Sequence, residues 1–203
     1  SIERPLVFGN NDTPGVMLSS AAKEYMKVYG VLVGKKPLIF TNNDSGYETA
    51  IEFKKNGVNP LILDTRKEPS SDIITEAKNL GIEIKYSYVV VAAKGYKKVK
   101  SADIAKISDN KKDLSNIENI ECDCICVSGF WTPSIHLASQ SGNKSEFNEK
   151  IDAFIPKKSK QKENTIGSAN GKFNLEETIN EAFNKGYEVS NKITENNNKV
   201  SIP

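Results

Sequence analysis

Histidine is almost absent from this 203-residue chain, and what else is scarce excludes several classes of protein. His136 is the only histidine, so a Ser–His or Cys–His nucleophile can form only through it. The net charge is only +2 and the lysines are interleaved with acids, so we expect no nucleic-acid partner. No apolar run approaches the roughly 20 residues of a membrane-spanning helix, and no signal peptide is visible. We therefore expect a cytoplasmic protein with no membrane partner.

Cysteine is also rare, and its spacing is more informative than its number. The three cysteines are Cys122, Cys124 and Cys126. A spacing of two on a β-strand predicts that all three sulfur atoms share one face. Zinc sites favour C-x-x-C pairs with further ligands, and only His136 is at hand, so we expect buried thiols and no metal site. Such close neighbours do not easily reach disulfide geometry, which indicates a reducing compartment.

Strands and helices alternate in the middle of the chain. Short strands at 38–41, 60–64 and 82–85 are separated by two helical patterns, the first with a capping box at Ser45 and Glu48. Short connections of this kind require a parallel sheet with right-handed crossovers. Three further β-rich segments between residues 86 and 127 indicate an antiparallel meander. The predicted fold class is α/β, with a Rossmann-like parallel sheet and an antiparallel β-meander.

The turn after the first of these strands lacks the glycines of a dinucleotide-binding fingerprint. Counting back from Gly46, the pattern G-x-G-x-x-G needs glycines where the chain has Thr41 and Asn43. Their side chains fill the approach of a pyrophosphate, and Asp44 adds a negative charge. Asp64 nevertheless lies about twenty residues on, where an acid binds a ribose hydroxyl in NAD sites. A structural turn is the favoured interpretation, with Thr41, Asn43 and Asp64 kept as cofactor-binding candidates.

Other features suggest a ligand site less directly. Arg66 could accept the 2′-phosphate of NADP beside the ribose. Trp131, within Gly129–Pro133, could stack on a ring, but a residue that packs two domains together is the favoured interpretation. His136 is expected to have an ordinary surface or interface role. The segment 166–171 precedes a helix N-terminus, so its backbone could face a cofactor phosphate or ribose.

The two ends of the chain lie outside the central unit. We expect residues 1–33 and 133–189 to belong to a first dinucleotide-binding domain, with residues 34–132 inserted as a second, Rossmann-like domain. Residues 190–203 are expected to form a flexible tail. On this interpretation the first strand and Gly-rich turn of the first domain lie upstream of Ser1. The chain, which has no initiator Met, is then an excised segment or a processed chain.

Several longer motifs resemble the alpha subunit of heterotetrameric sarcosine oxidase. They occur in order at Glu3–Phe8, Asn10–Met17, Phe40–Ser45, Cys122–Pro133 and Gly167–Gly171. The resemblance implies a glutathione-reductase-like flavoprotein fold, with a second dinucleotide domain and part of the first in this chain. It also implies NAD in the first domain of the intact subunit, and FAD and FMN elsewhere in the complex.

The same resemblance implies a function and a set of site residues. Gly167, Ala169, Asn170 and Gly171 would lie beside NAD, and beta, gamma and delta subunits would be the partners. The complex would oxidatively demethylate sarcosine to glycine and release hydrogen peroxide. We expect the chain itself to be a nucleotide-binding or scaffold region that has no catalytic residues and binds no cofactor stably. A subunit of an opine or related amine oxidoreductase, or a non-catalytic subunit-interaction module, are the alternatives.

Overall fold

The computed structural model describes residues 1–108, 114, 116–157, 159 and 161–197. The chain divides into two compact units. The larger is Glu3–Phe130, and the smaller comprises Ser1–Ile2 with Trp131–Pro203. Two short strands, β1 (Ile2–Glu3) and β10 (Trp131–Thr132), form a two-stranded sheet. Among the described helices, none combines the length and apolar character needed to cross a membrane.

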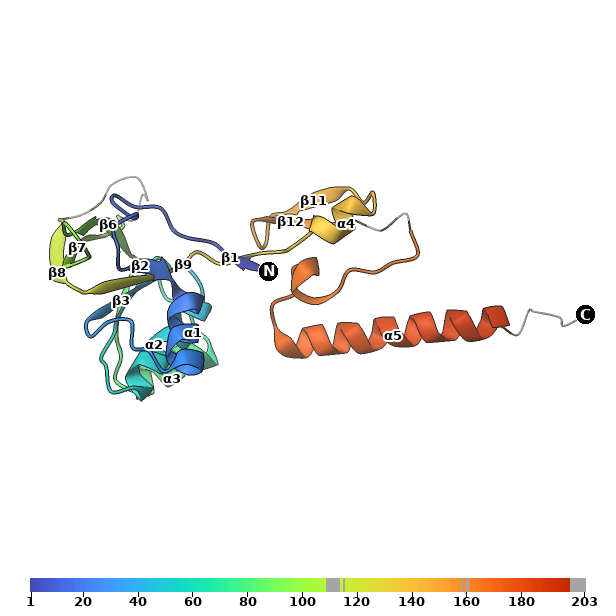
Figure 1. Ribbon diagram of the computed structural model, residues 1–203, viewed down its shortest axis with the longest axis horizontal. Helices are drawn as coiled ribbons and strands as arrows, with labels where there is room; N and C mark the ends of the chain where they lie inside the picture. The colour runs from blue at the N-terminus through green and yellow to red at the C-terminus, as the bar shows by residue number, and fades with distance from the viewer. Residues whose placement is uncertain (109–113, 115, 158, 160, 198–203) are drawn as a thin grey trace, which may run out of the picture. The chain divides into compact units, whose positions relative to one another are not determined.

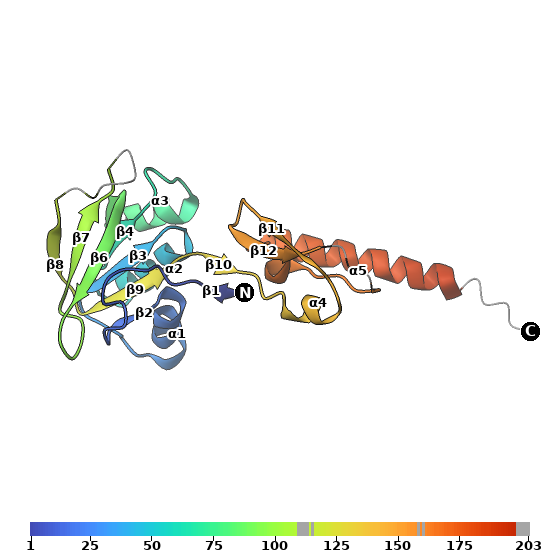
Figure 2. The same ribbon diagram turned by 90° about the horizontal axis from the view of Figure 1, so that it is seen from above.

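A five-stranded parallel sheet forms the centre of the larger unit (Figure 2). In order across the sheet, its strands are β2 (Val16–Leu18), β9 (Cys124–Ser128), β3 (Pro37–Thr41), β4 (Leu61–Asp64) and β5 (Glu83–Tyr86). Every neighbouring pair is parallel. β3 and β9 are buried along their whole length, as expected for parallel strands that are covered on both faces.

Helices cover one face of this sheet and antiparallel strands cover the other (Figure 1). The helices are α1 (Ser19–Tyr29), α2 (Ser45–Lys55) and α3 (Asp72–Asn79), and the antiparallel strands are β6 (Tyr88–Lys94), β7 (Ser101–Lys106) and β8 (Glu118–Glu121). Alternation along β3 places Ile39 in the core under the helices and Leu38 and Phe40 in the core under the antiparallel strands. The predicted α/β class, with its parallel sheet and antiparallel meander, is confirmed.

The first 33 residues pack differently from the sequence-based expectation. They were expected in the first domain, but residues 3–33 lie in the unit of the central sheet. β2 extends the sheet beside β9, and α1 lies against α2, where the Thr49 hydroxyl donates to the carbonyl oxygen of Ser19 at 2.9 Å. Phe8 is buried, with its ring edge-on to Phe40 at 5.8 Å between centroids. The apolar pattern of this segment indicates that it packs, without indicating against which sheet.

The smaller unit contains α4 (His136–Gln140), the hairpin of β11 (Ser145–Asn148) and β12 (Ala153–Pro156), the 3₁₀ turn η1 (Gly167–Asn170) and α5 (Leu175–Asn197). The side chain of Asn174 caps α5 by accepting from the amide of Glu177 at 3.1 Å. Gly186 lies inside this helix, and the described part of the expected tail, 190–197, is helical. A glycine weakens a helix by about 1 kcal/mol, and it ends one when it adopts the left-handed conformation. Gly186 does not adopt a positive φ.

Candidate functional site

The turn after β3 lies at the carboxyl ends of the parallel strands, where open α/β folds bind ligands. In this chain the turn is filled by its own side chains. The Thr41 hydroxyl donates to the carbonyl oxygen of Asn43 at 2.8 Å and accepts from the Asn43 amide at 3.1 Å. Gly46 is required for this packing, because a Cβ there would approach the Thr41 hydroxyl oxygen to 2.7 Å. Thr41 therefore occupies the space that a fingerprint glycine leaves open.

Asn43 connects this turn to the neighbouring strand and helix. Its side-chain nitrogen donates to the carbonyl oxygen of Ser128, at the end of β9, at 3.0 Å. Its side-chain oxygen accepts from the Ser45 amide at 2.9 Å and from the Ser45 hydroxyl. The expected capping box is therefore not formed: Ser45 is the first helical residue, and Glu48 pairs with Lys23 instead. One of the free amides at the start of α2 is bound by Asn43 and is not available to a phosphate.

Asp64 is fully buried at the end of β4 and binds donors of its own chain. One carboxylate oxygen accepts from the Tyr47 hydroxyl at 2.7 Å and from Nη2 of Arg66 at 2.8 Å. The other accepts from the amide of Arg66 at 2.9 Å and from its Nε at 3.0 Å. A carboxylate offers about four acceptor positions, so this set leaves none for a ribose hydroxyl. The opposite side of the Arg66 guanidinium pairs with Asp44 at 2.8 Å.

Electrostatics strengthen this arrangement. Burial raises the pKa of Tyr47, and the hydrogen bond to Asp64 raises it further, so the hydroxyl stays protonated and donates. Burial lowers the pKa of Arg66, but its hydrogen bonds to Asp64 and Asp44 outweigh that effect and raise it overall. The guanidinium that could have accepted a 2′-phosphate is therefore committed to two carboxylates. The residues at this edge satisfy one another.

The other candidate segment, Gly167–Gly171, lies in the smaller unit against α5. Its centre is Glu181 of α5, whose carboxylate accepts from the Gly167 amide at 2.8 Å and from the Asn170 side chain at 3.1 Å. Lys172 also pairs with this carboxylate at 3.1 Å. Burial would raise the pKa of Glu181, but these donors, with the Gly167 amide the strongest, lower it overall. Glu181 thus provides the negative charge that a ligand phosphate would bring to the Gly167 amide.

The backbone conformation and the close packing at positions 167 and 171 both favour glycine. Gly167 and Gly171 have φ values of 65° and 78°, which favour glycine. A Cβ on Gly167 would lie 2.9 Å from a methyl of Thr178, and one on Gly171 would lie 2.8 Å from Ile151. Ala169 and Asn170 lie between them on η1 and are half-buried. The segment is therefore held in one shape by α5 and by the residues beside β12.

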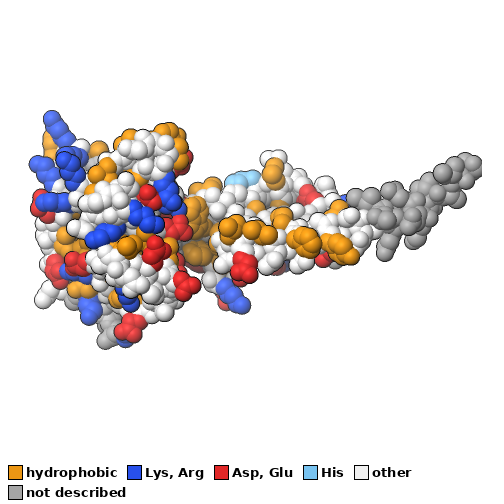
Figure 3. All heavy atoms as spheres, turned by 90° about the horizontal axis from the view of Figure 1, so that it is seen from below, with side chains coloured by type: hydrophobic (Ala, Val, Ile, Leu, Met, Phe, Trp, Pro, Cys, Tyr) orange, Lys and Arg blue, Asp and Glu red, His pale blue; other side chains and the backbone are white. Residues whose placement is uncertain are grey.

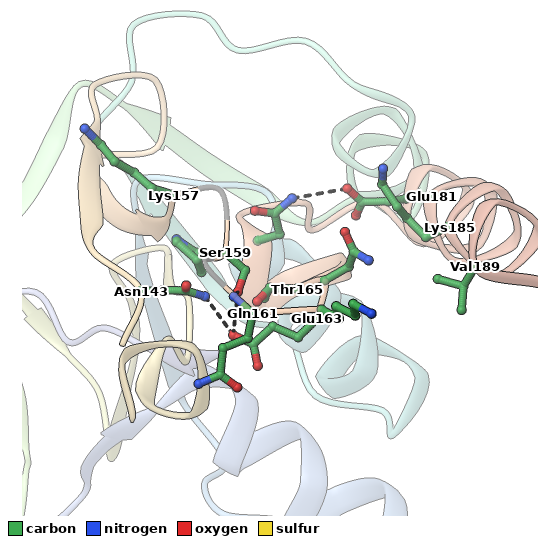
Figure 4. A pocket seen from close by; sticks show the side chains of 13 residues that line it. Asn143, Lys157, Ser159, Gln161, Glu163, Thr165, Glu181, Lys185 and Val189 are labelled. Carbon is green, nitrogen blue, oxygen red and sulfur yellow. Dashed lines mark hydrogen bonds between the residues drawn. The ribbon is translucent and has the colours of Figure 1, made fainter. Parts of the chain in front are cut away.

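A cavity of about 780 Å³ opens beside this segment (Figure 4). Glu163 accepts from the Asn143 side chain at 2.8 Å and from the Ser159 hydroxyl at 3.1 Å. Asn170, Glu181 and Lys185 also line it, in company with Pro156, Lys157, Gln161, Lys162, Asn164, Thr165 and Val189. The size is within the ~300–1,000 Å³ typical of small-molecule sites. Asn143 and Glu163 were missed from the sequence because they belong to no spaced motif.

The candidate residues predicted from the sequence are divided between the two units. Thr41, Asn43 and Asp64 lie in the larger unit and Gly167–Gly171 in the smaller. His136 is exposed at the start of α4, and Trp131 is half-buried in β10. No group of metal-ligating side chains occurs among the residues that the structure describes.

The cysteines are free and buried, but they do not share one face. Cys124 and Cys126 pack under the helices, whereas Cys122 packs under the antiparallel strands. The prediction of a shared face is wrong for Cys122, because the chain bends at Asp123 between β8 and β9. The Asp123 carboxylate stabilises that bend by accepting from the amides of Lys35 and Lys36 at 2.7 and 2.8 Å.

Comparisons with known proteins agree with this architecture, although no protein-family model matches the chain. The fold is similar to that of T. acidophilum thioredoxin reductase, with a TM-score of 0.58, 15% identity, and coverage of 83% of this chain and 58% of that one. It is also similar to the flavoprotein disulfide reductase RclA from Escherichia coli, with a TM-score of 0.60, 16% identity, and coverage of 87% and 39%. At such identities the likeness establishes the dinucleotide-binding fold alone.

Sequence similarity is more specific. The chain is 30% identical over 173 residues to sarcosine oxidase subunit alpha of Corynebacterium sp. (strain P-1). The matched region covers 84% of this chain and 18% of the relative. It is 35% identical over 154 residues to the subunit of the same name from Rhizobium meliloti (strain 1021), which covers 75% of this chain and 14% of the relative. The chain thus spans less than a fifth of the length of these relatives. The resemblance that the motifs predicted is confirmed, and this chain is a homologue of one segment of the sarcosine oxidase alpha subunits.

Proposed function

We propose that this chain acts as a region of an oxidoreductase of the sarcosine oxidase alpha kind, and that its two units have different roles. The sequence similarity to sarcosine oxidase alpha subunits is the observation that carries this proposal. The larger unit is a scaffold with a dinucleotide-binding fold and no nucleotide of its own. The smaller unit forms one wall of a dinucleotide site, with NAD as the ligand. Catalysis of sarcosine oxidation, with glycine and hydrogen peroxide as products, would need groups outside this chain.

The groups of the smaller unit fit the sugar and amide parts of a dinucleotide better than its phosphates. The Gly167 amide already donates to the Glu181 carboxylate, which would repel a phosphate at that point. Asn170 and Thr165 line the cavity and offer donors and acceptors suited to hydroxyl and carboxamide groups. Lys157, Lys162 and Lys185 line the same cavity and could neutralise phosphates farther from η1. NAD would supply hydride-transfer chemistry; the residues here would bind and orient it.

Residue-resolved NMR of the 203-residue chain, titrated with NAD, tests both roles at once. We expect weak binding that shifts the amide signals of 167–171 and leaves those of 41–46 unchanged. Asn170→Ala should abolish the shifts. Asn42→Ala, which alters a half-buried asparagine of the closed turn, should leave them unchanged and serves as the matched control. Shifts centred on 41–46, or no shifts at 167–171 at any NAD concentration, would contradict the proposal.

The catalytic assignment has a separate test. Purified chain mixed with sarcosine should produce no hydrogen peroxide above a heat-denatured control, because the proposed reaction needs groups from elsewhere. Turnover by the chain alone would overturn the scaffold role. An opine or another secondary amine remains the alternative substrate, and the same assay run with those amines on the complete enzyme separates the two.

A further inference from the structure

The loop between β6 and β7 contains the densest group of lysines in the described structure. Residues 94–100 read Lys-Gly-Tyr-Lys-Lys-Val-Lys, and we call them the lysine tip. They connect paired strands whose last register pair is Lys94 with Ser101. Figure 2 shows the hairpin extending beyond the parallel sheet, and Figure 3 shows basic side chains gathered at this end of the unit, at the upper left. The sequence has one other lysine-rich run, at 157–162, and in most of the rest of the chain lysines are interleaved with acids.

The tip is held in one conformation. Val99 is fully buried, and its amide donates to the carbonyl oxygen of Pro14 at 2.9 Å. The Lys100 amide donates to the carbonyl oxygen of Lys94 at 2.8 Å, closing the loop. Gly95 has a φ of 153°, and a Cβ there would lie 1.9 Å from the carbonyl oxygen of Lys98. A loop anchored in this way loses little conformational entropy when it binds a partner.

The charge of the tip is largely uncompensated. Lys94 pairs with Asp103 at 3.0 Å. For Lys97, Lys98 and Lys100, the described residues provide no carboxylate within ion-pair distance. Tyr96 lies among them with 92% of its surface exposed. Tyrosine is enriched at protein interfaces, where its ring packs and its hydroxyl hydrogen-bonds. The tip thus presents one aromatic ring surrounded by three positive charges that have no carboxylate partner among the described residues.

We propose that the lysine tip is a docking site for an acidic protein surface, on which Tyr96 packs while Lys97, Lys98 and Lys100 pair with carboxylates. The carboxylates that border the tip favour a protein over a nucleic acid. Asp103 lies beside Lys94, and Glu121 pairs across the strands with Ser101. A continuous phosphate backbone would have to pass these acids, whereas a compact acidic patch need not. This inference stands apart from the dinucleotide site, because none of its residues lines that cavity.

Fluorescence anisotropy with labelled poly-L-glutamate tests the proposal on the 203-residue chain. We expect binding at low ionic strength that weakens steeply with added salt. Lys97→Gln/Lys98→Gln/Lys100→Gln should weaken it about tenfold, because three exposed ion pairs are lost. Tyr96→Ala should weaken it a further few-fold. All four side chains are exposed, so the urea midpoint should not change, which separates lost binding from lost folding.

A second triple variant provides the control. Lys27→Gln/Lys55→Gln/Lys78→Gln removes the same charge from the helix-covered face, so both variants change the net charge from +2 to −1. This control should bind within about twofold of the wild-type chain, since exposed pairs elsewhere contribute little. An equal loss in both variants would mean that binding follows net charge and would overturn the assignment. Absence of binding to poly-L-glutamate, or tighter binding to duplex DNA of the same charge, would also overturn it.

Discussion

The buried carboxylate of Asp64 offers the most direct test of how much the larger unit is stabilised by its own side chains at the carboxyl edge of the sheet. Asp64→Asn keeps the shape of the side chain and removes its charge. The Tyr47 hydroxyl then donates to a neutral oxygen, and the amide and Nε of Arg66 face an amide nitrogen that cannot accept. The substitution therefore breaks a buried charge network while it opens no cavity.

The size of the effect follows from burial. Removing one partner of a buried ion pair costs about 3–5 kcal/mol. The Arg66 side chain is 31% exposed and keeps Asp44 at 2.8 Å, so water and the second acid recover part of that loss. We expect Asp64→Asn to lower the free energy of unfolding by about 2–3 kcal/mol. Tyr47→Phe, which removes one hydrogen bond to a charged acceptor, should cost about 1.5–2 kcal/mol. Asp44→Asn, at a half-exposed position, should cost less than about 1 kcal/mol.

Urea unfolding followed by circular dichroism measures this order, with one denaturation curve for each variant. A double variant, Asp64→Asn with Arg66→Gln, should cost less than the sum of the two single variants, because each removes the same pair. The reasoning fails if Asp64→Asn is no more destabilising than Asp44→Asn. It also fails if the double-variant cycle is additive, since Asp64 and Arg66 would then act independently.

Three further outcomes can be checked on the same chain. Burial raises the pKa of Cys122 to about 12 from 9.0, so above pH 9 the unfolded chain loses a proton that the folded chain keeps. Stability should therefore fall between pH 9 and 12, and Cys122→Ala should flatten that fall in urea titrations. Glu181→Gln should speed hydrogen exchange at the Gly167 amide about tenfold by NMR, because a charge-assisted hydrogen bond is weakened. Leu175, Ile179, Phe183 and Tyr187 form an exposed apolar row on α5. Figure 3 shows apolar side chains on the surface of the smaller unit. Phe183, which is 74% exposed, can be replaced by Glu, and this should change the unfolding free energy by less than about 0.5 kcal/mol. A larger loss would mean that this row is packed within the chain.

The central sheet could be predicted because each of its elements carries its own signal. β3 and β4 are short apolar segments, β5 alternates charged and apolar residues, and the helices beside them have a clear apolar face, so period and length distinguish the two types. The absence of a dinucleotide-binding fingerprint in the turn after β3 could also be predicted, because two missing glycines are a local feature. The contacts that the side chains of this turn make within the chain could not be predicted. The contact between Asn43 and Ser128 joins residues 85 positions apart, and no local pattern encodes it.

The errors share a physical cause, which is that a local pattern does not determine its tertiary partner. The segment 16–29 reads as strand and helix in either domain, and only packing beside β9 and α2 decides between them. The sequence spacing of Cys122, Cys124 and Cys126 predicts that their side chains lie on one face of a strand. The bend at Asp123 interrupts that alternation and places Cys122 on the other face. The lysine tip was visible in the sequence. It was overlooked because net charge averages over the whole chain, whereas docking depends on local charge.

The closed turn shows how a dinucleotide-binding fold can satisfy, with its own side chains, the groups that usually bind a nucleotide. In a binding site, the first amides of the helix and the acid after the second strand stay unsatisfied until the ligand arrives, so the ligand contributes to stability. Here Asn43 binds the amide of Ser45, and Tyr47 and Arg66 saturate Asp64. The stabilisation that a ligand would have provided is thus present in the chain at all times. Glycines at 41 and 43 would remove the contacts of Thr41 and Asn43 but would leave Asp64 bound to Tyr47 and Arg66. The polar groups at this edge are therefore satisfied within the chain, and their stabilising contacts do not require a ligand.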